Sequence, residues 1–181
     1  MSSLNSGREK LFIKPTSSVE IKGTSNVVGF TCKIDGDRFS DTVVVAFENK
    51  EKTFVFSDFK FPLPVDDFSC GNSFLTKDFK KTLCEEDHPM LTVTMLRFTQ
   101  TRVHDLGIMD WGILDSEFTV AGVKKTYRIE VRRDLSDFGF IMKGEVVVDM
   151  CAFGIEAKSS LPMVKVDDDL LIRFSFAFDQ L

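Results

Sequence analysis

Polar aromatic residues and histidine are scarce in this chain. Its 181 residues include one Tyr, one Trp and two His, against 19 Phe. Phe buries apolar area but lacks the hydrogen-bonding group that Tyr and Trp carry. This usage argues against a site that hydrogen-bonds a sugar or a nucleotide and suits an apolar interior. The hydrophobic share of 43% also argues against disorder.

Catalytic and metal-binding motifs are missing as well. There is no G-x-S-x-G nucleophile elbow and no phosphate-binding loop. His104 and Asp105 are sequence neighbours, whereas catalytic triads assemble from distant segments. No C-x-x-C pair occurs, and Cys84 with His88 supplies only half of a zinc-site spacing. We therefore expect no enzyme, no cofactor and no metal site.

Charge and hydropathy limit the partners. A net charge of −5 gives no basic footprint, so nucleic acid is not an expected partner. No apolar run approaches the roughly 20 residues that span a bilayer, so no stable membrane insertion is expected. Residues 1–10 are polar and do not resemble a signal peptide. A removed signal would leave the same picture, so export remains open.

Alternating apolar residues indicate strands along most of the chain. The clearest alternation places Leu170, Ile172, Phe174, Phe176 and Phe178 on one face. Similar patterns occur at 19–22, 28–34, 59–63, 91–95, 118–120, 127–132 and 138–148, and residues 43–47 form a continuous apolar run. About eight or nine strands without helical crossovers predict an all-β, antiparallel barrel or sandwich. We expect residues 1–10 to be a flexible tail and residues 11–181 to be a single domain.

One short helix interrupts the strands. Ser73 is the expected N-cap, and apolar residues recur near helical spacing at Phe74, Leu75, Phe79 and Leu83. Pro89 prevents the helix from continuing. We therefore predict a helix over about residues 73–84, between two strands.

Four segments, in order, carry a resemblance to a known family. They read SSVEIKGTSNVVGFTCKIDG, LPVDDFSCGNSFLTKDFKKTL…HPMLTVTM, GILDSEFTVAGVKKTYRIEV and MKGEVVVDMCAFGIE. Together they resemble the YceI-like family of polyisoprenoid-binding proteins over roughly residues 12–179. Many members place an Arg and an Asp just before the Phe-Gly pair. Here Met150, Cys151 and Ala152 occupy those places, so any polar role of the Arg and Asp does not carry over.

The resemblance implies a lipocalin-like barrel of about eight strands with an elongated apolar cavity. The implied ligand is a long-chain lipid such as an isoprenoid, which the protein would bind, transport or sequester. It also implies a periplasmic or otherwise exported location, and members are often homodimers. The residues expected to line the cavity are Phe30, Val93, Met95, Phe118, Val120, Ile129, Phe140, Met142, Phe174 and Phe176.

The same side chains have an alternative interpretation. A barrel of about eight strands can be filled by its own side chains instead of holding a ligand. The protein would then be a non-catalytic β-domain that acts through its surface. Recovery of a lipid with the purified protein would separate the two interpretations.

The cysteines complete the implications of the resemblance. Cys32 follows the second strand and Cys70 precedes the helix, and both positions match the family, which suggests a Cys32–Cys70 disulfide. Sequence alone does not fix the pairing, and buried free thiols are the alternative.

Overall fold

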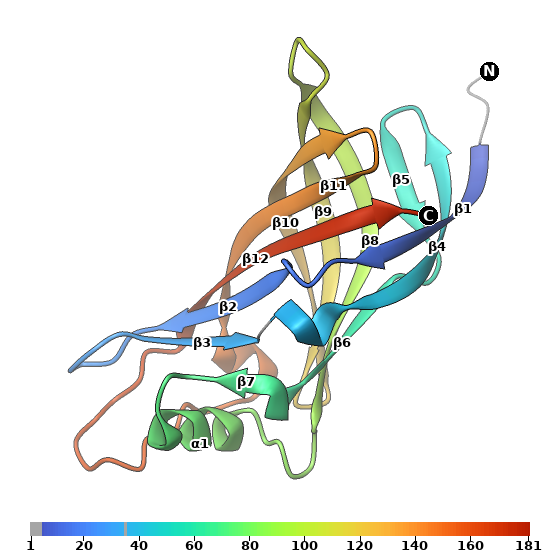
Figure 1. Cartoon of the computed structure of the whole chain (residues 1–181). Helices are drawn as coiled ribbons and strands as arrows, with labels where there is room; N and C mark the ends of the chain where they lie inside the picture. The colour runs from blue at the N-terminus through green and yellow to red at the C-terminus, as the bar shows by residue number, and fades with distance from the viewer. Residues whose placement is uncertain (1–4, 35) are drawn as a thin grey trace.

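The computed structural model describes residues 5–34 and 36–181, and its main feature is a strongly curved antiparallel sheet of twelve strands (Figure 1). The strands are β1 (Asn5–Ile13), β2 (Ser18–Gly23), β3 (Phe30–Ile34), β4 (Asp41–Lys50), β5 (Thr53–Phe56), β6 (Lys60–Pro64), β7 (Phe68–Ser69), β8 (Met90–Val103), β9 (Met109–Val120), β10 (Val123–Ser136), β11 (Gly139–Asp149) and β12 (Asp169–Gln180). One α-helix, α1 (Ser73–Thr82), and three 3-10 turns, η1 (Gly36–Phe39), η2 (Val65–Asp67) and η3 (Met150–Phe153), complete the fold.

Eight of the strands close into a ring, so the predicted antiparallel barrel is confirmed. The ring runs β1-β4-β5-β8-β9-β10-β11-β12 and closes where β1 pairs with β12. Every pairing in it is antiparallel. The strands β8 to β11 follow one another through short turns, whereas the long segment 150–168 joins β11 to β12. This order explains why sequence alternation was informative, because each strand turns one face into the ring.

At two places a long strand of the ring pairs with two shorter strands, one after the other along its length. The end of the barrel where the second strand of each pair lies is called the wide end. β1 pairs with the last residues of β12, whereas β2 pairs with its earlier part at Leu171–Ser175. A turn at Pro15 separates β1 from β2. Beside this turn, the buried Ser17 hydroxyl accepts a hydrogen bond from the Ala177 N–H. β5 and β6 divide β8 in the same way. β3 and β7 then continue the sheet beyond β2, at the lower end in Figure 1.

Aromatic rings pack against one another inside the barrel toward the β10–β11 turn, which lies at the upper end in Figure 1. The Phe178 ring lies 4.9 Å from Phe140 and 6.3 Å from Phe59, centroid to centroid. Above them, the buried Asp110 carboxylate accepts hydrogen bonds from Arg133 Nε at 2.9 Å and from Arg133 Nη2 at 2.6 Å. The Arg133 guanidinium also lies over the Phe98 ring, 4.3 Å from its centroid. We call this region the packed end.

The sequence predictions differ from the structure at three places. The flexible tail predicted over residues 1–10 is wrong for Asn5–Lys10, which pair with β4 as part of β1; residues 1–4 lie outside the described part of the chain. The sequence does not reveal this strand, because its first residues are polar and largely exposed on both faces, so they show no apolar alternation. Val28 and Phe138, which were expected in strands, lie in turns just before β3 and β11 and are 63% and 78% exposed.

Candidate functional site

An apolar cavity of about 70 Å³ lies inside the barrel near its wide end. Side chains from β2, β6, β7, β8, β9, β10 and β12 surround it, because alternate residues of the strands face inward. Seven of the ten residues predicted to line a cavity lie around it: Val93, Met95, Phe118, Val120, Ile129, Phe174 and Phe176. Sequence reasoning missed other lining residues, among them Phe61, Leu63, Phe68, Leu91, Leu114 and Ile172.

The cavity stops where the packed end begins. Phe61 and Phe176 stack across its upper edge with ring centroids 4.9 Å apart. Phe39, from η1, meets Phe176 edge-on at 5.5 Å. Offset and edge-on pairs of this kind are favourable beyond the area they bury. The three rings therefore close the barrel above the cavity.

One hydroxyl interrupts the apolar wall. Ser116 on β9 is fully buried, and its Oγ donates to Met95 Sδ at 3.4 Å. A thioether is a weak acceptor, so this bond satisfies the hydroxyl poorly. Ser116 can therefore donate a better hydrogen bond to an oxygen atom of a molecule that enters the cavity.

A second and larger space opens outside the cavity, between α1, the β2–β3 turn and the segment 155–168. This hollow has a volume of about 370 Å³. Its floor is formed by apolar side chains of several elements: Phe30, Leu75, Phe79, Leu83, Met150, Val166 and Leu170. The predicted lining residue Phe30 lies here and not in the inner cavity. Its ring packs on Gly23, where an added Cβ would come within 2.3 Å of the ring.

Two rings in tilted contact lie where the cavity and the hollow adjoin. Phe68 on β7 faces the cavity, and Phe79 on α1 faces the hollow. Their centroids are 5.3 Å apart, and both side chains are buried. The contact between these two rings therefore joins the lining of the cavity to the lining of the hollow.

The remaining two predicted lining residues lie elsewhere. Phe140 contacts Phe178 and lies 5.6 Å from the Arg133 guanidinium, within the packed end. Met142 is buried opposite Phe176 in the β11–β12 pair and borders neither space. Both face inward, as predicted, but the barrel is filled at their level.

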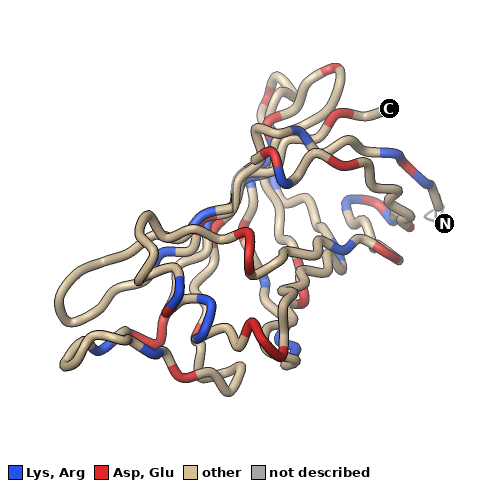
Figure 2. Tube along the Cα trace, turned by 60° about the horizontal axis from the view of Figure 1, so that its bottom comes forward, with Lys and Arg blue, Asp and Glu red and all other residues tan. Residues whose placement is uncertain are grey.

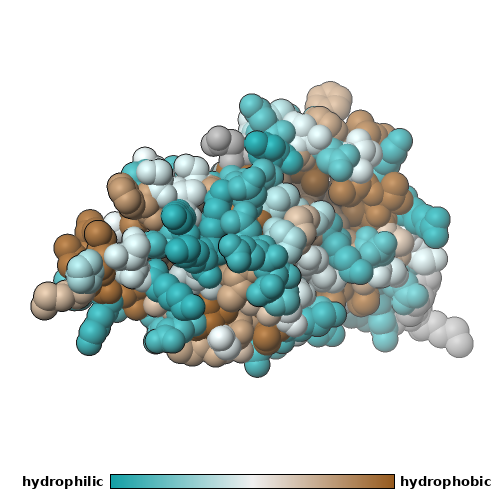
Figure 3. All heavy atoms as spheres, turned by 90° about the horizontal axis from the view of Figure 1, so that it is seen from below, coloured by the Kyte–Doolittle hydropathy of each residue, from teal (hydrophilic) through white to brown (hydrophobic). Residues whose placement is uncertain are grey.

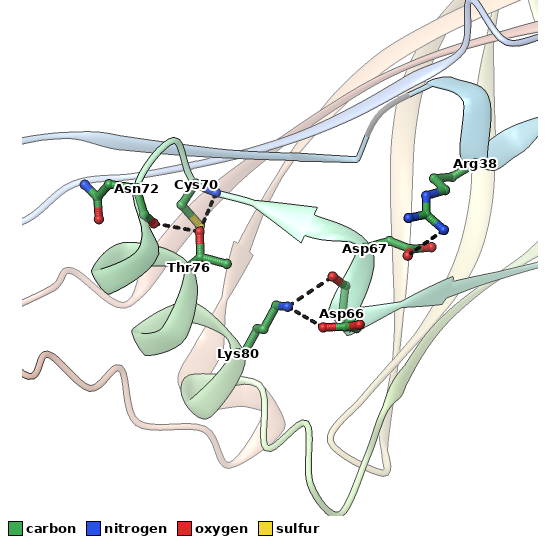
Figure 4. A network of polar contacts seen from close by, with 7 residues as sticks. All are labelled: Arg38, Asp66, Asp67, Cys70, Asn72, Thr76 and Lys80. Carbon is green, nitrogen blue, oxygen red and sulfur yellow. Dashed lines mark hydrogen bonds and ion pairs between the residues drawn. The ribbon is translucent and has the colours of Figure 1, made fainter.

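The helix that forms one wall of the hollow is fixed by polar contacts (Figure 4). Lys80 Nζ donates to the Asp66 carbonyl oxygen at 3.1 Å and also bonds the Asp66 carboxylate. The Cys70 N–H donates to Thr76 Oγ1 at 3.0 Å, and that hydroxyl donates to the Asn72 carbonyl oxygen at 2.8 Å. The N-cap is Asn72, whose side chain accepts from the Leu75 N–H, so the prediction of Ser73 was wrong by one residue.

A disulfide fixes the start of the same helix. Cys32 on β3 is bonded to Cys70, with the two Cα atoms 4.0 Å apart. This is the pairing that the family resemblance suggested. Both cysteines are buried, while Cys84 and Cys151 are free and exposed. The bond joins the sheet extension to α1 just below the hollow.

Titratable groups contribute little to either space. Within residues 5–34 and 36–181, no three His, Cys, Asp or Glu side chains converge as metal ligands would. Burial raises the pKa of the Tyr127 hydroxyl, whose ring packs 5.1 Å from Phe118 behind the cavity wall. No helix of the described residues is long and apolar enough to cross a membrane. The cavity and the hollow are therefore lined mainly by apolar side chains, and the buried hydroxyl in the cavity wall is that of Ser116.

Comparison with known proteins agrees with this fold. A family model described as a YceI-like domain matches residues 13–178. A solved polyisoprenoid binding domain from Saccharophagus degradans, implicated in plant cell wall breakdown, superposes with a TM-score of 0.68 at 9% identity, covering 97% of this chain and 100% of that chain. BcnA from Burkholderia cenocepacia superposes with a TM-score of 0.56 at 14% identity, covering 89% and 95%. No curated protein sequence matches the chain.

Proposed function

The chain belongs to the YceI-like domain family, and we propose that it binds a long-chain apolar lipid, such as an isoprenoid, at the wide end of its barrel. One observation carries the proposal: an apolar hollow of about 370 Å³ lies beside an apolar cavity, and Phe68, which lines the cavity, packs against Phe79, which lines the hollow. Ligand pockets of small molecules commonly measure about 300–1000 Å³, so the hollow is large enough for part of a lipid.

The inner cavity alone is too small for a long chain. At about 70 Å³ it holds a short apolar segment at most. We therefore propose that the lipid lies mainly in the hollow and that its end passes between Phe68 and Phe79 into the cavity. Met95 supports this arrangement, because an unbranched thioether side chain can repack around an irregular ligand.

The relatives and the disulfide support further parts of the proposal. Polyisoprenoid binding is stated for the Saccharophagus degradans domain, whose fold this chain shares. The Cys32–Cys70 bond favours an oxidising compartment, such as the periplasm or the cell exterior. We propose that the protein acts there by carrying or sequestering the lipid, without catalysis.

The filled packed end favours a second candidate. If the rings at the wide end are equally immobile, the protein is a β-domain with a closed core that works through its surface. The small inner cavity and the stacked Phe61–Phe176 pair are the observations on its side. The two candidates differ in whether the purified protein carries a lipid.

Native mass spectrometry with organic extraction tests the proposal. We expect wild-type protein to carry a long-chain lipid at about one molecule per chain, since the hollow and the cavity adjoin at the Phe68–Phe79 contact and would be occupied by one lipid. Ala157→Trp places a large ring in the hollow and should abolish the bound lipid. Ala152→Trp is the matched control, because Ala152 is exposed on η3 and borders neither space. Folded wild-type protein that carries and accepts no lipid would support the closed-core candidate instead.

A further inference from the structure

Three loop segments meet around the mouth of the hollow: the β2–β3 turn at 24–29, the start of α1 at 72–75, and the segment 157–166. Polar groups hold them together. Asn26 Nδ2 donates to the Met163 carbonyl oxygen at 3.0 Å, and Asn26 Oδ1 accepts from the Lys165 N–H at 2.9 Å. On the other side, Asp78 Oδ2 accepts from the Ser160 N–H at 2.8 Å. The backbones of the three segments are thus fixed by their polar side chains.

The apolar side chains of these segments remain exposed. The exposed residues are Val27 at 70%, Val28 at 63%, Phe74 at 71%, Leu161 at 57% and Met163 at 92%, and we call this set the apolar rim. All but Met163 also line the hollow. Hydrophobic spheres gather at the left end of the molecule in Figure 3, which views it from below. Contiguous exposed apolar surface of this kind marks an interaction site.

Positive charge accompanies the rim in an otherwise acidic chain. Residues 24–29 and 157–166 contain no Asp or Glu, and the loops at the left of Figure 2 have long uncharged stretches. Lys77, Lys158 and Lys165 are exposed on or beside these segments, and none forms an ion pair within the described residues. Acidic residues flank the segment 157–166 at Glu156 and at 167–169, outside the rim itself. Asp78 and Asp167 accept hydrogen bonds from Ser160 and Thr24.

We propose that the apolar rim docks onto the surface of an anionic lipid bilayer. This inference rests on the proposed function: a long-chain lipid resides in a bilayer, and docking the mouth of the hollow there lets the chain transfer without crossing water. The apolar side chains would enter the interface while the three lysines face lipid phosphates, the arrangement that interfacial protein segments use. The contact is peripheral and reversible.

A second copy of this chain fits the rim less well. Lysine is depleted in protein interfaces, and a twofold axis through the rim would bring the unpaired lysines of both copies together. An anionic surface complements the same lysines. Charge therefore favours a bilayer as the occupant.

Vesicle co-flotation tests the docking. Wild-type protein should float with vesicles of phosphatidylglycerol and phosphatidylcholine, and high salt should weaken the binding. The double variant Phe74→Ser with Met163→Ser should bind at least about tenfold more weakly, because two interfacial apolar side chains are lost. Phe138→Ser is the matched control, since Phe138 is equally exposed but lies at the packed end. Lys158→Glu with Lys165→Glu should weaken binding to anionic vesicles more than binding to vesicles of phosphatidylcholine alone.

The outcomes separate docking from lipid binding. Ala157→Trp should lose its lipid but still float, while Met163→Ser, at the one rim residue that does not line the hollow, should float less and still take up a short-chain prenol from solution. No flotation of the wild type, or equal flotation of the Phe74/Met163 and Phe138 variants, would overturn the proposal. So would a concentration-dependent dimer that the Phe74/Met163 variant loses, because the rim would then bind a second copy. Flotation without any lipid bound in solution would leave docking standing and reject the proposed function.

Discussion

The two ends of the barrel contain the same kinds of residue in opposite arrangements. At the packed end, phenylalanine rings contact one another and a buried ion pair lies over them. At the wide end, which we call the open end from here on, similar rings border the cavity and the hollow. Valine, leucine, methionine and phenylalanine side chains of the apolar rim face solvent there. The comparison indicates a division of roles: the packed end stabilises the fold, and the open end can therefore be left incompletely packed for a ligand.

The largest expected effect comes from breaking the packed end at its ion pair. Asp110→Ala leaves the Arg133 guanidinium largely buried without its carboxylate. We expect the free energy of unfolding to fall by about 3–5 kcal/mol, as in other buried pairs that lose one partner. Urea denaturation measures this. Glu145→Ala is the control, because Glu145 pairs with Arg173 on the surface and should cost at most about 1 kcal/mol.

Truncating one ring at each end compares the ends directly. Phe178→Ala should cost about 3–5 kcal/mol, because its ring contacts other rings on several sides. Phe174→Ala should cost roughly 1–2 kcal/mol less, since a ring that borders a cavity has fewer contacts to lose. Equal losses in denaturation experiments on lipid-free protein would show that the open end is packed as tightly as the other.

Removing the disulfide should loosen the open end selectively. Cys32→Ala with Cys70→Ala should lower the free energy of unfolding by about 2–4 kcal/mol, given the sequence separation of 38 between the cysteines. Hydrogen exchange should accelerate in α1, while amides of β10 and β11 at the packed end keep their relative protection. Cys84→Ser with Cys151→Ser is the control, because both thiols are free and exposed. Uniform acceleration across the barrel would contradict a local role.

The smallest effect concerns pH. The hydrogen bond from Lys80 holds the pKa of the Asp66 carboxyl below its ordinary value of about 3.9. A carboxyl with a lowered pKa in the folded state stabilises that state above its unfolded pKa, and this contribution disappears as the pH falls through the folded pKa. The contact between α1 and η2 should therefore weaken only below about pH 4. NMR titration of Asp66 would show this, and Lys80→Met should raise its pKa; an unchanged pKa would rule out the contact in solution.

Much of the fold could be predicted from sequence because strand alternation is local. The β12 pattern Leu170–Phe178 and the helix near residue 73 needed no knowledge of distant partners. The division into two ends could not be predicted this way. The Asp110–Arg133 pair depends on the register between β9 and β10, which fixes two distant positions opposite each other.

The candidate site was only partly predictable for the same reason. Inward-facing residues such as Phe118 and Phe174 were identified, but alternation does not reveal whether the barrel is filled at their level, as it is at Phe140. The hollow was missed because it lies between loops. Apolar residues inside turn-rich segments, such as Val27 and Leu161, were the one available signal.

Photolabelling tests most directly whether the open end holds the lipid. A long-chain prenol with a photoreactive diazirine at its apolar end is bound to the protein, irradiated, and located by peptide mass spectrometry. We expect labels on α1, on the segment 157–166 and on cavity residues such as Phe118, and none in Ala157→Trp. Labels concentrated at the packed end, around Phe140 and Phe178, or equal labelling of the Ala157→Trp variant, would contradict the account.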